Sequence, residues 1–215
     1  MKPSIFNYFT FCIVLLIFTA NAQSQFAIGL VGGLNRSSLY IENPWENTTM
    51  VPKYGLIIGA TGRYILPPNY YITGQLRYIE KGQNTEWKHF IFDYSEAQFN
   101  YLELPIHLNY NFTLNSMIPK IFGGVYFAYL INAMARVKIN GEVVDEDDSI
   151  DGFNRFDFGV DLGVGLDINV NNNGVLFFDI CYSHGLVNIR NIGSTIKNRG
   201  YQISLGFIYS IKLAI

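Results

Sequence analysis

Residues 98–112 read QFNYLELPIHLNYNF, a stretch in which apolar side chains recur at every second position. One parity consists of Leu102, Leu104, Ile106, Leu108, Tyr110 and Phe112, and the other of Tyr101, Glu103, Pro105, His107, Asn109 and Asn111. Because successive side chains of a β-strand point to opposite faces, we predict a strand with one apolar and one largely polar face. Such a long, regular strand behind a secretory signal indicates a membrane-spanning β-barrel.

The N-terminus has the features of a signal peptide. Lys2 supplies positive charge, residues 9–18 form an apolar run, and residues 20–22 read Ala-Asn-Ala, a small-x-small cleavage site. We expect residues 1–22 to be removed and residues 23–215 to form an outer-membrane β-barrel domain. A retained anchor is the alternative, disfavoured because the run is shorter than the ~20 residues of a spanning helix. Cleavage removes Cys12 and leaves Cys181, so no internal disulfide is expected.

The composition favours a barrel over a helical membrane protein. Charged residues make up 15% of the 215 residues, below the ~25% of soluble domains, and aromatics reach 16%. The net charge of −2 predicts no nucleic-acid partner. After the signal, the most apolar stretch, residues 121–135, is interrupted by Gly123, Gly124 and Asn132. Lipid offers no hydrogen-bond partners to the backbone groups at an open sheet edge. A closed barrel is therefore the expected membrane architecture.

Alternating segments and their connections predict the topology. The segments are residues 26–35, 54–66, 70–82, 98–112, 120–132, 155–168, 175–186 and 201–213. The connections at residues 36–53, 83–97, 133–154 and 187–200 are long, whereas those at 67–69, 113–119 and 169–174 are short. We therefore predict an all-β fold, an eight-stranded antiparallel transmembrane β-barrel with short periplasmic turns, long extracellular loops and both termini in the periplasm.

A soluble barrel with its apolar face inside is the main alternative fold. Residues 155–168 argue against it, because the face opposite the apolar one carries Gly159, Gly163 and Gly165 rather than a water-facing set of Lys, Glu and Thr. We expect these glycines to lie in a narrow lumen, where they leave room for Arg63, Arg77 and Tyr126. Seven tyrosines lie near segment ends: Tyr54, Tyr64, Tyr70, Tyr78, Tyr110, Tyr201 and Tyr209. Their positions fit the interfacial girdles of outer-membrane barrels, and they fit equally well the general preference of tyrosine for strands.

A series of short motifs, in order along nearly the whole mature chain, resembles the PorT family of outer-membrane β-barrel proteins. The motifs are GGLN at 32–35, LRYIEKG at 76–82, YLELP at 101–105, DFG at 157–159 followed by Gly163 and Gly165, and YSHGLVNI at 182–189. The resemblance implies an eight-stranded outer-membrane barrel. As an alternative role, it implies a link to a protein secretion system, to which the family's namesake is linked.

Ionisable residues gather on the predicted lumen parity: Arg63, Arg77, Lys81, Glu103, His107, Asp157, Asp161, Asp167 and Asp179. One hypothesis is a proton relay or ion path. The preferred hypothesis is a network of buried pairs that fills the lumen, because an eight-stranded interior is only just wide enough for side chains.

Other candidate chemistry is weaker. Asp147, Ser149, Asp151 and Gly152 match the opening of a calcium loop, but Phe158 stands where the closing glutamate belongs. Ser183 and His184 lie near a rim where some small barrels act on lipids, but adjacent strand residues face opposite ways, and Asp179 lies farther along the strand. His89 lies in a loop, and no His/Cys spacing suggests zinc. We expect no cofactor, no metal and no catalysis.

Pro105 lacks a backbone N–H in the middle of its strand, so a bulge or a locally missing ladder bond is expected there. Three roles follow from this reading of the sequence. The first is a monomeric structural or interaction barrel in contact with outer-membrane lipid. The second is a component of a secretion system with protein partners, as for the PorT namesake. The third, disfavoured, is a lipid-modifying rim enzyme.

Overall fold

The structure is a computed structural model, and it describes residues 26–42, 48–87, 94–112, 117–139, 142–148, 150–191 and 193–211. The expected signal peptide, the loop residue His89 and the last residues of the chain lie outside these ranges. The described residues contain no candidate membrane-spanning helix.

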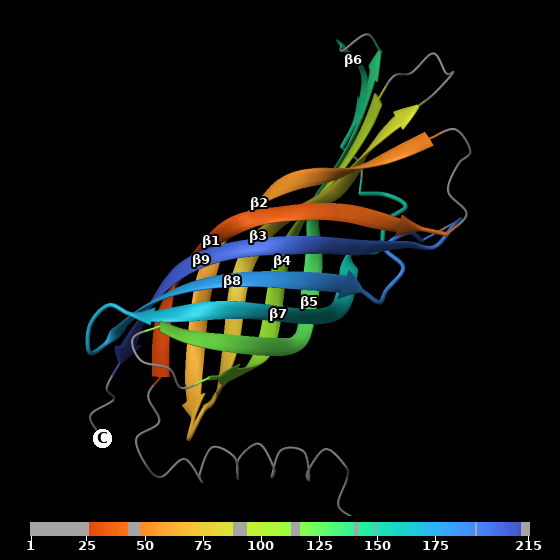
Figure 1. Cartoon of the computed structure of the whole chain (residues 1–215). Helices are drawn as coiled ribbons and strands as arrows, with labels where there is room; N and C mark the ends of the chain where they lie inside the picture. The colour runs from red at the N-terminus through yellow and green to blue at the C-terminus, as the bar shows by residue number, and fades with distance from the viewer. Residues whose placement is uncertain are drawn as a thin grey trace, which may run out of the picture.

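Nine antiparallel strands make up the described part of the chain. They are β1 (Phe26–Ile41), β2 (Thr48–Leu66), β3 (Tyr70–Trp87), β4 (Tyr94–Asn111), β5 (Met117–Ile139), β6 (Glu142–Asp147), β7 (Phe156–Asn169), β8 (Gly174–Gly185) and β9 (Ile196–Ile211). Pairings β4–β5, β5–β7 and β9–β1 close eight of them into a ring, and β6 pairs with β5 outside it. The predicted eight-stranded barrel is confirmed, and Figure 1 shows its tilted strands.

The burial pattern is that of an inside-out barrel. In β7, Leu162 is 70% exposed and Phe156 is 68% exposed, whereas Asp157 and Asp161 are 2% and 3% exposed. In β4 the exposed side chains alternate with buried ones in the predicted parity. A soluble barrel would bury the apolar set instead, so this alternation excludes the soluble alternative.

The prediction of a long loop at residues 133–154 is partly wrong. There β5 continues to Ile139 and turns back as β6, because the backbone ladder continues where no lipid demands an apolar face. Strands β2, β3 and β4 also extend past the predicted limits. Residues 48–53, 83–87, 94–98, 133–139 and β6 thereby form one sheet, here called the projecting sheet, which rises beyond the ends of β7 to β9 (Figure 1).

Pro105 interrupts the ladder as predicted. The pairs Gly74–Ile106 and Arg77–Glu103 flank a gap between β3 and β4, while Pro105 remains paired with Tyr126 on β5. The gap has no register shift, so proline removes local pairing without displacing the strand.

Apolar clusters lie at both ends of the lumen. The larger one, at the long-loop end, consists of Ile57, Ile79, Phe99, Tyr101, Tyr126, Ala128, Leu130, Ala133, Ile189 and Ile196. The smaller one, at the short-turn end, consists of Ala27, Val31, Phe177 and Ile208. The charged residues expected from the sequence lie between and beside these clusters: Arg63 is the register partner of Ala27, and Asp167 that of Phe177.

Candidate functional site: the charged lumen

All nine ionisable residues predicted for the lumen point into it, and all but the partly buried Asp179 are buried. They come from β2, β3, β4, β7 and β8, so the ring brings together residues far apart in the sequence. Alternation explains this convergence, because one parity of every strand faces the barrel axis.

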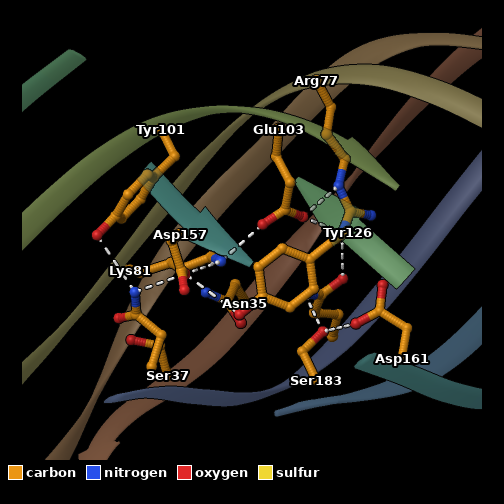
Figure 2. Close-up of polar contacts among 12 residues, drawn as sticks. Asn35, Ser37, Arg77, Lys81, Tyr101, Glu103, Tyr126, Asp157, Asp161 and Ser183 are labelled. Carbon is orange, nitrogen blue, oxygen red and sulfur yellow. Dashed lines mark hydrogen bonds and ion pairs between the residues drawn. The ribbon is translucent and has the colours of Figure 1, made fainter. Parts of the chain in front are cut away.

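The centre of the lumen is a four-residue ion network (Figure 2). Arg77 Nη2 lies 2.6 Å from Glu103 Oε1, and these two residues are direct partners in the β3–β4 register. Lys81 Nζ lies 2.6 Å from Glu103 Oε2 and 3.4 Å from Asp157 Oδ2. The fully buried Glu103 thus forms ion pairs with two cations. Such pairing is what allows a carboxylate to be tolerated in a low-dielectric interior.

Aromatic and amide groups complete the environment of Asp157. Its Oδ2 accepts hydrogen bonds from the Tyr126 hydroxyl at 3.2 Å and from Asn198 Nδ2 at 2.9 Å. Lys81 Nζ lies 4.1 Å from the centroid of the Tyr126 ring and 5.1 Å from that of Tyr101. The cation is therefore held by carboxylates and by ring faces together (Figure 2).

A second group joins four strands around Asp161. His107 Nε2 lies 2.9 Å from Asp161 Oδ2, and the Ser183 hydroxyl donates to Asp161 Oδ1 at 2.5 Å. Gln202 Nε2 in turn donates to Ser183 Oγ at 2.8 Å. Because the serine proton is directed at the aspartate and not at the histidine, these residues do not form a nucleophile–base pair.

A third group lies toward the short turns. Asp167 accepts from Arg63 Nη1 at 2.7 Å and from the Tyr71 hydroxyl at 3.1 Å. Lys120 Nζ lies 2.9 Å from Asp167 Oδ1 and 2.7 Å from Asp179 Oδ1. The sequence reading missed Lys120, although it shares the parity of Phe122, Gly124 and Tyr126; its segment is apolar on both parities, so the facing was not fixed.

The central part of the lumen is filled rather than open, and a cavity of about 250 Å³ adjoins Arg63 and Tyr71 at the short-turn end. Each of the four lumen cations, Arg63, Arg77, Lys81 and Lys120, is in an ion pair. The cavity beside Lys81, Tyr126 and Ser183 measures about 10 Å³, close to the minimum that admits one water molecule. Within the described residues this geometry favours the network of buried pairs over an ion path.

The glycines predicted to make room in the lumen do so, mainly for aromatic rings. A Cβ on Gly159 would lie 2.4 Å from the Tyr126 ring, and one on Gly163 would lie 2.2 Å from the Phe122 ring. A Cβ on Gly165 would meet Asp179 and Lys120 instead. Tyr126 was predicted correctly, whereas Arg63 and Arg77 are not among the nearest neighbours of these glycines.

Among the described residues, the structure does not bring the remaining candidates together as sites. Ser183 is buried in the lumen, whereas His184 on the outer face contacts the Tyr182 hydroxyl at 3.3 Å, as their adjacent positions predicted. Asp179 pairs with Lys120 rather than with Ser183. Ser149 of the calcium hypothesis lies outside the described ranges, and within them no three His, Cys, Asp or Glu side chains converge as a metal site.

Comparison with known proteins agrees with this architecture. The family model described as "Outer membrane protein beta-barrel domain" matches residues 21–191, most of the chain. The chain belongs to this family. It is therefore an outer-membrane β-barrel protein, and its exposed apolar band faces lipid. The match does not single out the PorT family. A comparison with curated proteins found no match.

The chain is similar to solved outer-membrane barrels at low identity. Neisserial surface protein A superposes with a TM-score of 0.50 at 12% identity, over 86% of this chain and 99% of its own. The N-terminal barrel of Pseudomonas aeruginosa OprF gives 0.45 at 12% identity, covering 88% and 100%. Ail of Yersinia pestis gives 0.43 at 12% identity, covering 85% and 98%.

The outward tyrosines of this outer-membrane barrel form two belts. At the long-loop end, Tyr54 on β2 and Tyr201 on β9 lie on either side of Arg36 on β1, each as its direct partner in the strand register. At the other end Tyr70 pairs with Tyr110, their ring centroids 5.0 Å apart. Placement at both edges of the apolar band favours the interfacial girdle over strand propensity alone.

Proposed function

We propose that this protein is a non-conducting, non-catalytic, monomeric barrel that anchors in the outer membrane and acts through the surface it presents outside. The observation that carries this proposal is the filled lumen, whose charges neutralise one another across the ring. A channel needs a continuous wet path, whereas the cavity beside Lys81, Tyr126 and Ser183 measures about 10 Å³.

Residues of the long connections that pack into the end of the barrel support the proposal that it does not conduct ions. Ile189, in the β8–β9 connection, is fully buried, and its backbone oxygen accepts from Asn154 N at 2.8 Å. Phe153 packs edge-on against Phe99, with ring centroids 4.9 Å apart. These contacts place apolar groups above the charged layer, where they exclude water from the long-loop end.

The projecting sheet is the surface best suited to a protein partner. All residues of β6 are exposed, including Val143 and Val144, and β6 pairs only with β5 among the described strands. A strand with a free edge can accept another extended chain through backbone hydrogen bonds.

This surface also supports a second candidate, a component of a protein secretion system. The candidate rests on the PorT-like motif series and on the exposed sheet as a place for secretion partners to dock. It predicts that deletion of the gene reduces export across the outer membrane. It further predicts that the barrel pulls down partner proteins from outer-membrane extracts.

Conductance and fractionation test the main proposal. The protein should be recovered with the outer membrane and should change gel mobility on boiling. In planar bilayers it should show no stable conductance steps, whereas a porin in the same bilayer provides the positive control. Reproducible steps from the purified barrel would overturn the filled-lumen interpretation. Loss of a lipid modification in His184→Ala would overturn the non-catalytic one.

A further inference from the structure

Three basic residues gather on the outer face of β9 and β1 at the long-loop end. These residues, Arg36, Lys197 and Arg199, are here called the basic patch. Their strand neighbours Ser37, Ile196 and Asn198 are buried in the lumen, so the three basic side chains point outward. The patch therefore lies on the surface that meets the membrane, not on the lumen side.

The register holds these side chains close together. Arg36 is opposite Tyr201, and Arg199, two positions along β9, is opposite Ser38 on one side and His184 on the other. Lys197 is opposite Tyr40. Diagonal neighbours of this kind lie roughly 7–8 Å apart, a spacing at which several cations can contact one anionic group.

The patch has no ion-pair partner among the described residues. None of its three members forms an ion pair with a described carboxylate, in contrast to the lumen cations. The adjoining acidic residue, Glu42, is exposed and forms no ion pair with the patch. Arg199 lies 4.3 Å over the Tyr40 ring, and its buried Nε has no hydrogen-bond partner in the described part of the chain.

The depth of the patch identifies its ligand. Tyr201, the register partner of Arg36, and Tyr182 on β8 form the membrane-side edge of the patch, with tilted rings whose centroids lie 5.1 Å apart. The exposed Leu34, Ile203 and Leu205 begin the lipid-facing band beyond them. Cations at the level of an aromatic belt or just outside it lie at the lipid head groups. Guanidinium groups bind phosphate oxygens in bidentate geometry.

We propose that the basic patch binds the phosphate of an anionic lipid in the outer leaflet. This proposal is independent of the proposed role of the loops. The lipid source is favoured over free phosphate because acyl chains attached to the same head group would lie along the apolar band beneath the patch.

Native mass spectrometry of the refolded mature barrel in detergent tests this site. The probes are phosphatidic acid, phosphatidylcholine with the same acyl chains, and inorganic phosphate. We expect retention of phosphatidic acid over phosphatidylcholine, and no displacement of it by an equal concentration of inorganic phosphate. The double variant Arg36→Gln/Arg199→Gln should bind phosphatidic acid about 25-fold more weakly, about fivefold for each charge removed.

A matched control removes the same charge elsewhere. Arg155 and Arg190 are exposed basic residues outside the patch, so Arg155→Gln/Arg190→Gln should retain wild-type binding. Equal losses in both double variants would reduce the effect to net charge and overturn the proposal. Equal retention of both lipids, or displacement by inorganic phosphate, would also overturn it. If the double variant fails the boiling-shift test for folding, the single variants, each expected to be fivefold weaker, decide the matter.

Discussion

Arg63 on β2 reaches Asp167 on β7 at 2.7 Å, although these strands are four positions apart in a ring of eight. The ion pair therefore crosses the barrel and fixes its opposite walls. Tyr71 and Lys120 also contact Asp167, so the carboxylate collects three partners in the short-turn half of the lumen.

Removing the carboxylate should destabilise the barrel. Asp167→Leu leaves Arg63 and one contact of Lys120 without a counter-charge, so we expect a loss of about 3–5 kcal/mol in the free energy of unfolding. Urea unfolding in lipid vesicles measures it. The double variant Arg63→Met/Asp167→Leu should recover part of the loss, because no unpaired guanidinium remains.

A surface ion pair is the control for this measurement. The Arg136–Glu146 contact at 3.2 Å is formed by half-exposed side chains on the projecting sheet. Glu146→Leu should change the free energy of unfolding by less than about 1 kcal/mol. Comparable losses in Glu146→Leu and Asp167→Leu would contradict a special role of the buried pair.

Glycines facing the lumen should not tolerate a methyl group. A Cβ on Gly163 would lie 2.2 Å from the Phe122 ring and 2.6 Å from the Ile180 carbonyl oxygen, so Gly163→Ala forces a shift. We expect a loss of about 1–3 kcal/mol, measured by the same urea titration.

Gly74 is the matched control, because a Cβ there meets nothing within 4 Å. Gly74→Ala should be neutral, or more stable by a few tenths of a kcal/mol, since alanine loses less backbone entropy on folding. Equal destabilisation by both substitutions would show that close packing in the lumen is not the cause.

The projecting sheet should loosen in acid. Burial alone would raise the pKa of Glu96, but hydrogen bonding to Lys53 and the charges of Lys53, Lys138 and Arg136 outweigh it and lower the pKa. A lowered folded-state pKa means that this stabilisation is complete above the ordinary value of 4.5 and is lost as the pH falls through the folded value.

Hydrogen exchange measures this change. After correction for intrinsic rates, amides of residues 94–98 should exchange faster at pH 3 than at pH 6, while amides of the barrel wall stay protected. In Glu96→Gln the acid-dependent part of the difference should vanish. An unchanged pH response in that variant would assign the effect to another group.

The β5–β6 hairpin should be dispensable for the barrel. Arg136 and Glu146 are direct partners, so residues 137–145 can be replaced by an Asn-Gly turn that closes the shortened hairpin. Ring closure runs through β4–β5–β7, so the boiling shift and the urea midpoint should stay unchanged. A lower midpoint would show that β6 supports the ring.

Within the membrane band, much of the fold followed from residue pattern. Leu102 and Leu104 outside and Glu103 inside were predictable, because lipid accepts one face and the lumen the other. The inward position of Lys120 was not predictable, because its segment has apolar residues on both parities and so lacks a contrast between an apolar and a polar face. Outside the band, β6 was missed because all its side chains are exposed and no alternation is required.

The amino-acid order by itself determined the inside-out barrel, the facing of the clearly alternating strands and the lumen charges that they carry, because a two-residue period against lipid admits one register. Tertiary structure alone decided which charges meet: Arg63 with Asp167 across the ring, and Lys81 between Glu103 and Asp157. It also decided that Arg36 and Arg199 lie together on the outside. These contacts depend on strand stagger and ring closure, which bring distant residues together and leave no trace in local sequence.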